Sequence, residues 1–437
     1  MAETIIIGAG FAVIGAAHFL NENRIDSTVF KKREAPEENR DAPDNEFKFD
    51  YGSHIGSTQN KCFAKLFNGS DELVRTTEKL NISHFLNGYS LKDPPIENLH
   101  KLPKPLVIKI VNELSVLKTQ NEKSANNLRE WLYATFGKTY TDLFLEKLIQ
   151  KTYTLPSDKI DFSEIINEFK RSSFGDILIG ALTNKTTETN KTLKINYPLE
   201  GNLSTFLNNA KAQTKFGYSV KSIDPKKKVV FFENGKKESY SYLVSSIPLP
   251  DLIGFIKDIP DKIKSATEKL AYTSCILVDI ETEKKLSSNS HCAYFYDSEI
   301  LFSQLIFPQA FSEKNASEKH GSVQALVHFS KKYKPLHLRP NSFIEPIINN
   351  LKRCDILEEN NKINYKAARL LPYANIIHDF NRKSNLSAIH KYLIELNIFY
   401  CGRYGLWTNL KADESFESGV SAAKKVKDIL SLKTVLK

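Results

Sequence analysis

The chain has 437 residues, of which 41% are hydrophobic and 26% are charged. These proportions are typical of a folded globular protein and exclude disorder along most of the chain, and the length predicts two or three domains. The formal net charge of +10 is carried mostly by scattered lysines. Such a charge suits an anionic small ligand, but the chain has no arginine-rich stripe or nucleic-acid-binding motif, so we expect no nucleic-acid partner.

The five cysteines are odd in number, far apart and without a CxxC pair. This pattern favours a reducing compartment, and we expect a cytoplasmic protein. The apolar run from Ile5 to Leu20 is interrupted by glycines, and no other run reaches the roughly 20 apolar residues that a membrane span needs. HExxH and GxSxG motifs are also absent, which removes the main signals of zinc proteases and α/β-hydrolases. The sequence therefore predicts no metal site and no membrane span, and it leaves the oligomeric state undefined.

The start of the chain predicts a dinucleotide-binding unit. A β-branched run at residues 4–7 is typical of a strand buried on both faces, and it leads into Gly8 and Gly10. Small and apolar residues at helical spacing follow at 11–20, and a second short strand is predicted at 27–30. This order is typical of a Rossmann-type βαβ unit, in which Gly8 permits a tight turn and Gly10 lets the backbone approach a pyrophosphate. The N–H groups at the helix N-terminus would then bind the pyrophosphate.

Two positions depart from this nucleotide-binding pattern. Val13 stands where the third glycine of the fingerprint is expected, so two methyl groups must be accommodated between the helix and the strand. Lys31, followed by Lys32, stands where an acidic residue would accept hydrogen bonds from a ribose. A lysine has three donors and no acceptor, so we expect these lysines to meet a phosphate instead.

The segment from about residue 86 to residue 190 has a helical pattern, with leucine, valine and isoleucine at helical spacing over residues 105–117. Asn127 is predicted to cap a helix, and Glu130 follows at the position that completes a capping box. The polar stretch Thr183–Thr192 is predicted to be a surface loop.

The second half of the chain predicts strands. Asn234-Gly235 lies between two stretches rich in β-branched and aromatic residues and predicts a hairpin with a type I′ turn. Alternating segments between about residues 262 and 390 suggest a sheet, and residues 322–329 alternate with period two. His328 falls on the face opposite the apolar side chains of this strand, and we interpret it as structural.

Several blocks spread over almost the whole chain resemble the motifs of one superfamily. They are Phe49–Ile55, Pro95–Leu99 with Leu102-Pro103, Glu130–Gly137, Tyr242–Pro250, and Gly402–Trp407 followed by Asp413–Gly419. On these blocks the chain resembles the FAD-dependent amine-oxidase and protoporphyrinogen-oxidase-like superfamily, near its UDP-galactopyranose-mutase-like branch.

The resemblance implies an α/β fold of three parts. A discontinuous Rossmann-type FAD/NAD(P)-binding domain would comprise residues 1–85, 193–261 and 391–437. A helical subdomain would comprise residues 86–192, and a mixed-sheet substrate-binding domain residues 262–390.

The resemblance also implies FAD as the cofactor and a set of site residues. His54, Tyr373 and Arg403 are the predicted catalytic residues, and Tyr404 is predicted to line the substrate cavity. The predicted cofactor-binding residues are Gly8, Gly10, Phe11, Lys31, Lys32, Gly52, Ser53, Val220, Gly402, Arg403, Asp413, Ser415 and Phe416.

Two of the predicted site residues and both tryptophans carry further expectations. Asp413 or Ser415 would cap a helix whose N-terminus faces the flavin and stabilises negative charge on it. Trp131 is interpreted as a core residue, and Trp407 as a core residue or a pocket wall.

Two further departures from the superfamily leave three hypotheses open. Relatives carry a Gly-Gly pair where this chain has Ala35–Arg40, and Gln304 stands where an arginine is expected. The leading hypothesis is an FAD-dependent oxidoreductase of an unknown small molecule. The second is a non-redox flavin mutase of a nucleotide sugar, which Gln304 disfavours because such an enzyme needs cations, arginine above all, to grip a diphosphate. The third is a pseudo-enzyme that has lost flavin and has a binding role.

Overall fold

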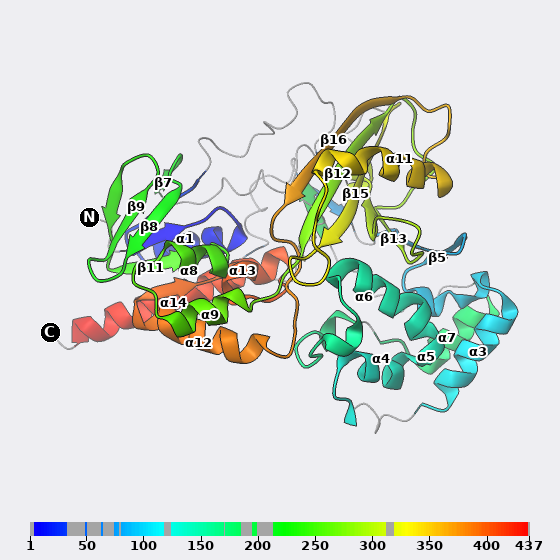
Figure 1. The fold of residues 1–437 in the computed structure, drawn as a ribbon, viewed down its shortest axis with the longest axis horizontal. Coiled ribbons are helices and arrows are strands. Elements are labelled where there is room, and N and C mark those ends of the chain that lie inside the picture. Colours follow the sequence, from blue (N-terminus) through cyan, green and yellow to red (C-terminus); the bar gives the residue numbers. More distant parts are fainter. Residues whose placement is uncertain are drawn as a thin grey trace.

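The computed structural model describes residues 4–32, 49, 63, 74–77, 80–117, 124–169, 171–184, 195–198, 213–311 and 319–435. Figure 1 shows its main parts: a first sheet with helices packed against it, a second sheet bearing α11 (Ile344–Arg353), and a helical region beside that second sheet. No helix in these ranges is both long and apolar enough to cross a membrane.

The first sheet is parallel and contains the predicted βαβ unit. Its strand order is β17-β11-β1-β2-β7, with every neighbouring pair parallel. The strands are β1 (Thr4–Ile7), β2 (Ser27–Phe30), β7 (Gln213–Lys215), β11 (Tyr242–Ser245) and β17 (Ile398–Tyr400). Helix α1 (Phe11–Glu22) connects β1 to β2, which confirms the predicted strand, glycine turn, helix and strand.

Both faces of this sheet are covered, because side chains alternate along each strand. Ile6 belongs to the cluster that α1 forms with α14 (Ala412–Val435) on one face. Ile5 and Ile7 belong to the cluster on the other face, together with residues of three further helices. These helices are α8 (Leu249–Phe255), α9 (Asp261–Glu268) and α12 (Arg382–Glu395).

Helices α1 and α14 approach each other through two glycines. A Cβ atom on Gly15 would lie 2.1 Å from the carbonyl oxygen of Phe416, and one on Gly419 would lie 1.8 Å from that of Ala12. Both distances are far shorter than a real contact, so glycine is required on both helices for this approach. The two ends of the chain are thereby held together.

The second sheet is mixed, as expected from the resemblance. Its order is β16-β12-β15-β14-β13-β4-β5, and only the β13–β4 pair is parallel. The strands are β4 (Ile82–Leu86), β5 (Tyr89–Lys92), β12 (Ser274–Thr282), β13 (Cys292–Phe295), β14 (Gln304–Ile306), β15 (Gly321–Phe329) and β16 (Ile363–Leu371). Strand β15 confirms the strand predicted from alternation, but all nine of its residues are buried. Both of its faces are covered, one of them by the apolar cluster that includes α11.

The helical region confirms the predicted cap at Asn127. Its helices are α3 (Lys104–Ser115), α4 (Leu128–Phe136), α5 (Lys138–Tyr140), α6 (Glu146–Tyr153) and α7 (Phe174–Leu182). The side chain of Asn127 accepts a hydrogen bond from the backbone N–H of Glu130 at 3.0 Å, and Nδ2 of Asn127 donates to the Glu130 carboxylate at 3.0 Å. Trp131 on α4 is 2% exposed and lies in the core of this region, as predicted.

The predicted hairpin is present, but the predicted turn type is wrong. Strands β8 (Val220–Asp224), β9 (Val229–Phe232) and β10 (Lys237–Ser239) form a small antiparallel sheet. At the β9–β10 turn only Gly235 has a positive φ, of 79°, whereas a type I′ turn needs positive φ at Asn234 as well. The backbone N–H of Phe232 donates to the carbonyl of Lys236 at 2.9 Å, so the loop has three residues and Gly235 takes its left-handed position.

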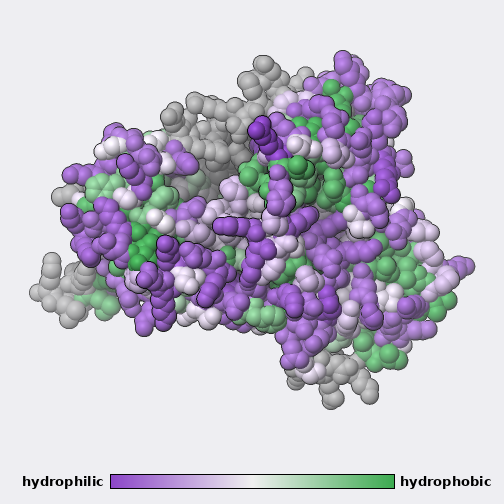
Figure 2. Space-filling model, in the orientation of Figure 1, coloured by the Kyte–Doolittle hydropathy of each residue, from purple (hydrophilic) through white to green (hydrophobic). Residues whose placement is uncertain are grey.

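The remaining described elements are short. They are β3 (Val74–Thr77), β6 (Ile195–Pro198), α10 (Pro308–Phe311), α13 (Gly402–Leu406), the π-helical turn Thr141–Leu145 and the 3-10 turns Pro95–Glu97, Leu99–Lys101, Ser157–Lys159, Ile166–Glu168 and Pro340–Phe343. The face of the molecule in Figure 2 is largely hydrophilic, with its hydrophobic side chains in separate patches.

Candidate functional site

The glycine turn after β1 leaves the N-terminus of α1 open. Gly8 has a φ of 136°, and a Cβ atom there would lie 2.0 Å from Oγ of Ser246, so the position requires glycine. Gly10 is the N-cap residue of α1; no side chain caps the helix and its first turn holds no acidic residue. A Cβ atom on Gly10 would meet no described atom within 4 Å. The first N–H groups of α1, including that of Phe11, therefore face a space that suits an anion.

The closing segment of the chain lies beside this glycine turn. Gly402 has a φ of 75° and begins α13 directly after β17 and Cys401. A Cβ atom on Gly402 would lie 3.2 Å from Cβ of Ala12 and 3.6 Å from Cβ of Ser246. The structure thus brings together Gly8, Gly10 and Gly402, which lie almost the whole chain apart in the sequence.

The start of α14 differs from the prediction. The helix begins at Ala412, so Asp413 and Ser415 lie in its first turn and neither is the N-cap residue. The prediction was wrong because Glu414 supplies the cap from inside the helix: its carboxylate accepts a hydrogen bond from the backbone N–H of Lys411 at 2.7 Å. Partial burial raises the pKa of Asp413 above its ordinary value.

Phe416 and Phe11 lie in one aromatic cluster. The Phe416 side chain is fully buried, with its ring centroid 5.9 Å from that of Phe63, and the Phe63 centroid is 5.5 Å from that of Phe11. Because its ring is in the core, Phe416 can meet a cofactor only through its backbone.

The far end of β2 carries the unexpected lysines. Lys31 is only 5% exposed, and its Nζ atom lies 5.7 Å from the centroid of the Phe216 ring. Lys32 is exposed. Val220, at the start of β8, is buried in the same cluster as Phe30 of β2. The backbone N–H of Tyr218 donates to the Lys31 carbonyl at 2.9 Å, so the segment that leads into β8 at Val220 lies beside the end of β2, where an adenosine is expected from the βαβ unit.

The residues fit the diphosphate part of a dinucleotide better than its ribose. The open α1 N-terminus and the close approach at Gly8 and Gly402 form a cradle for an anion. At the ribose end, neither Lys31 nor Lys32 can accept a hydrogen bond from a hydroxyl group. Three predicted site residues, namely Gly52, Ser53 and His54, lie outside the described residues, as do Ala35–Arg40.

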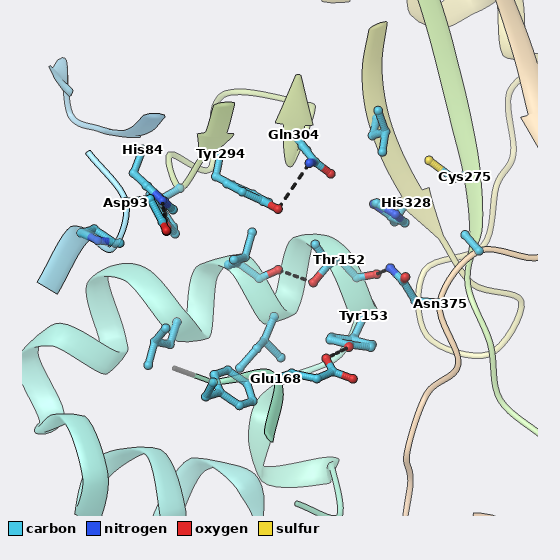
Figure 3. A pocket seen from close by; sticks show the side chains of 18 of the residues that line it. His84, Asp93, Thr152, Tyr153, Glu168, Cys275, Tyr294, Gln304, His328 and Asn375 are labelled. Carbon is cyan, nitrogen blue, oxygen red and sulfur yellow. Dashed lines mark hydrogen bonds and ion pairs between the residues drawn. The ribbon is translucent and has the colours of Figure 1, made fainter. Parts of the chain in front are cut away.

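A cavity of about 490 Å³ lies between α6 and the second sheet, and α13 contributes to it (Figure 3). This volume is in the range of small-molecule sites. Apolar and aromatic side chains form most of the wall. The polar and charged side chains that line it are His84, Asp93, Tyr140, Thr152, Tyr153, Glu168, Tyr294, Tyr296, Gln304, His328, Asn375, Arg403 and Tyr404.

One end of the cavity is organised around His84. Its Nε2 atom lies 3.1 Å from Oδ1 of Asp93, and its Nδ1 atom lies 2.6 Å from the hydroxyl oxygen of Tyr296. The Tyr294 ring stacks on the imidazole at 5.3 Å, and its hydroxyl accepts a hydrogen bond from Nε2 of Gln304 at 3.3 Å. Both ring nitrogens of His84 are therefore already engaged.

Another part of the cavity contains Arg403 and a carboxylate. The Tyr153 hydroxyl donates to Oε2 of Glu168 at 2.8 Å, and Nδ2 of Asn409 donates to the Tyr153 hydroxyl at 3.2 Å. Burial raises the pKa of Glu168 above its ordinary value, opposed by hydrogen bonding from Tyr153 and Asn409 and by the charge of Arg403. Glu168 lines the cavity and its side chain is exposed to solvent there, so the surrounding protein removes only part of its hydration.

Arg403 uses much of its hydrogen-bonding capacity within the protein. Its Nε and Nη2 atoms donate to the carbonyl of Leu410 at 3.1 and 2.8 Å, and its Nη1 atom donates to the carbonyl of Ala374 at 3.4 Å. Its side chain is therefore fixed at the edge of the cavity, beside the segment that begins at Gly402.

His328 lies on the cavity wall, and its interpretation as structural stays a prediction. The face of β15 opposite its apolar cluster faces the cavity, and Nδ1 of His328 lies 3.3 Å from Oγ of Ser303. Burial lowers the pKa of His328 to about 4, so the imidazole is neutral at physiological pH.

Tyr373 is placed away from the cavity wall, whereas Tyr404 lines it. The Tyr373 hydroxyl donates to Oδ1 of Asp251 at 2.8 Å, and its ring packs between those of Tyr272 and Tyr404 at 4.6 and 5.7 Å. Trp407 is fully buried, its ring centroid 5.6 Å from that of Tyr272, so it is a core residue.

The sequence reasoning missed His84, Asp93, Tyr153 and Glu168. They come from β4, the turn after β5, α6 and the 3-10 turn before Phe169, and no local spacing relates them. Only the tertiary fold brings these side chains into one cavity.

Comparisons with known proteins agree with this architecture. A family model for NAD(P)-binding Rossmann-like domains matches residues 6–69. No curated protein matches the chain. Among solved structures, reduced UDP-galactopyranose mutase is 20% identical with a TM-score of 0.86, covering 98% of this chain and 96% of that one. A protein from Exiguobacterium sp. 255-15 assigned as a protoporphyrinogen oxidase is 12% identical with a TM-score of 0.73, covering 97% and 98%. A fatty acid isomerase from P. acnes that produces CLA is 11% identical with a TM-score of 0.61, covering 97% and 98%.

At these identities the likeness concerns the fold. The match over the first βαβ unit confirms the predicted Rossmann-like segment. The chain has the α/β fold shared by UDP-galactopyranose mutase and the protoporphyrinogen-oxidase-like protein, and the resemblance drawn from its sequence blocks is confirmed at the level of the fold.

Proposed function

We propose that the chain is an FAD-dependent oxidoreductase that acts on a small molecule bound in the cavity between α6 and the second sheet. The observation that carries this proposal is the open N-terminus of α1 at Gly10, beside Gly402 and next to Arg403 at the cavity edge. A cofactor held by its diphosphate at Gly10 would have the cavity within reach.

Different residues of the chain would bind the cofactor and the substrate. The N–H groups that follow Gly10 would hold the diphosphate, and glycine at 8 and 402 lets the backbone come close to it. When bound, FAD supplies a centre that accepts or donates a hydride. The cavity would orient the substrate and exclude bulk water from it.

A nucleotide-sugar mutase is the second candidate, because UDP-galactopyranose mutase has a TM-score of 0.86 to this chain. The described wall of the cavity argues against it. Arg403 is the one arginine or lysine in that wall, and three of its N–H groups donate to backbone carbonyls. Gln304 is neutral, while Asp93 and Glu168 would repel a diphosphate. A pseudo-enzyme without flavin is the third candidate, since Lys31 removes the ribose acceptor.

The first test is cofactor retention. Purified protein is incubated with FAD and desalted, and its visible absorption spectrum is recorded. We expect bound flavin in the wild type and loss of retention in Gly10→Val, whose side chain would enter the open space over the α1 N-terminus. Gly254→Val on α8 is the matched control, because Gly254 also faces no described atom within 4 Å.

The outcomes separate the candidates. Wild-type protein without flavin would support the pseudo-enzyme, and equal retention by Gly10→Val would place the diphosphate elsewhere. If flavin is held, reduced protein that isomerises a UDP-sugar without net oxidation would favour the mutase. Flavin reduction by a substrate without isomerisation would favour the oxidoreductase.

A further inference from the structure

Glu168 is a carboxylate that faces the cavity and is held in one orientation. It ends the 3-10 turn Ile166–Glu168, and its Oε2 atom accepts the hydrogen bond of Tyr153 from α6. Figure 3 shows Glu168 and Tyr153 side by side on the α6 side of the cavity. Oε2 is thus bound by Tyr153, and we assign the proton that Glu168 exchanges to Oε1.

Asn409 fixes the direction of this hydrogen bond. Its Oδ1 atom accepts from the backbone N–H of Ile376 at 2.9 Å, and its Nδ2 atom donates to the Ile376 carbonyl at 3.2 Å. The amide is therefore oriented, and the same Nδ2 atom donates to the Tyr153 hydroxyl at 3.2 Å. A hydroxyl has a single hydrogen to donate. Because the Tyr153 oxygen accepts from Asn409, its own hydrogen is directed to Glu168.

The other carboxylate, imidazole and guanidinium groups of the cavity wall are less suited to exchanging a proton. Both nitrogens of His84 are engaged, and Asp93 is engaged with His84 at the other end of the cavity (Figure 3). His328 is buried and stays neutral at physiological pH. The Arg403 guanidinium is permanently charged.

Arg403 connects the position of Glu168 with the proposed cofactor site. It lies close enough to Glu168 and Tyr153 to act on both electrostatically, and it belongs to the segment that meets the glycine turn. A substrate reacting at that edge of the cavity would have the Glu168 carboxylate beside it. Such a position matters because a general base must lie within hydrogen-bond reach of the proton it takes.

We propose that Glu168 is the group that exchanges a proton with the substrate in this cavity, with Tyr153 and Asn409 as its positioning residues. The inference rests on the proposed function. In the forward direction an O–H or N–H bond of the substrate breaks, its electron pair stays on the substrate atom, and an O–H bond forms at Oε1 of Glu168. The reverse step returns the proton.

The first experiment uses FAD-loaded protein without oxygen and a panel of alkyl and aryl primary amines and secondary alcohols. The rate at which each compound bleaches the flavin is measured against pH. We expect Glu168→Gln to lower that rate by about 100-fold or more and to remove one limb of the pH profile, with FAD retention unchanged. Glu395→Gln, on an exposed residue at the end of α12, is the matched control and keeps the wild-type rate and profile. A wild-type rate in Glu168→Gln would overturn the inference.

The second experiment needs no substrate. Protein labelled with carbon-13 at the glutamate carboxyl is titrated by NMR, and the Glu168 signal is identified by its loss in Glu168→Gln. We expect it to titrate above the ordinary range of a glutamate and to move higher still in Tyr153→Phe, because the hydrogen bond that favours the ionised form is removed. Glu395→Gln should leave it in place.

The two experiments distinguish the two proposals. If no compound bleaches the wild-type flavin, the oxidoreductase proposal fails and the titration alone decides the inference. A Glu168 signal that titrates in the ordinary range of a glutamate, or that Tyr153→Phe does not move, would overturn the inference whatever the flavin does.

Discussion

Replacing Gly419 by alanine tests whether the contact between α1 and α14 holds the cofactor site together. The new Cβ atom would lie 1.8 Å from the carbonyl oxygen of Ala12. A carbon and a carbonyl oxygen normally stay about 3.3 Å apart, so the helices must separate by about 1.5 Å where they cross. A radial gap of roughly 0.5–1 Å already loses a quarter to a half of a contact's dispersion energy. The buried faces around Ala16 on α1 and Ala423 on α14 would both be affected.

We expect Gly419→Ala to lower the free energy of unfolding by about 2–4 kcal/mol, although alanine gains about 1 kcal/mol over glycine in a helix. Urea unfolding followed by circular dichroism measures the change, and FAD retention should weaken with it. Gly254→Ala on α8 is the matched control, since its Cβ meets no described atom within 4 Å and should stabilise by up to about 1 kcal/mol. A Gly419→Ala protein as stable as the control would show that the close helix contact carries no such energy.

Three further predictions concern single side chains. The pKa of His328 is about 4 in the folded protein and 6.5 in the unfolded chain, so the unfolded state binds more protons between these values. The free energy of unfolding should therefore fall by about 3 kcal/mol as the pH drops from 7 to 4. Urea unfolding at both pH values should show a smaller loss in His328→Gln, and an equal loss would contradict the pKa. Glu146 accepts hydrogen bonds from Arg129, Gln150 and Ser157. Glu146→Ala should therefore lower the free energy of unfolding by about 2 kcal/mol in the same assay. An unchanged free energy of unfolding would mean that water replaces these bonds. Asn127→Ala should lower the free energy of unfolding by about 1 kcal/mol, because the cap of α4 is lost. No change would mean that the hydrogen bond between Asn126 and Glu130 is enough to stabilise the start of the helix.

The parts of the fold that depend on local physics could be predicted from the sequence. The run of residues 4–7, the glycine turn and the helix after it are encoded by β-branching and side-chain periodicity within one stretch. The Asn127 cap is likewise decided within one turn of helix. Where two local solutions compete, the prediction failed: Glu414 caps α14 in place of Asp413.

The cavity could not be predicted in the same way, because its polar groups are assembled by tertiary contacts. His84 meets Tyr296 across the β4–β13 pairing, and Glu168 meets Tyr153 through the packing of a 3-10 turn on α6. Each of these residues, taken alone in the sequence, is an ordinary polar side chain. His328 shows the limit most clearly, because alternation placed it on the correct face of β15 but did not reveal that this face borders a cavity.

The departure at Val13 bears less on cofactor binding than the sequence alone suggests. Val13 is fully buried and belongs to the cluster that fills the space between α1 and the first sheet, together with Ile6 and Val244. The spacing of α1 from the sheet is thus set by a valine where the nucleotide-binding fingerprint uses a glycine. The position of α1 is fixed from its other side, through the backbone contact at Gly419. Since no described atom lies within 4 Å of a Cβ atom on Gly10, the valine changes what supports the helix without placing a described side chain over its N-terminus, which suits an anion.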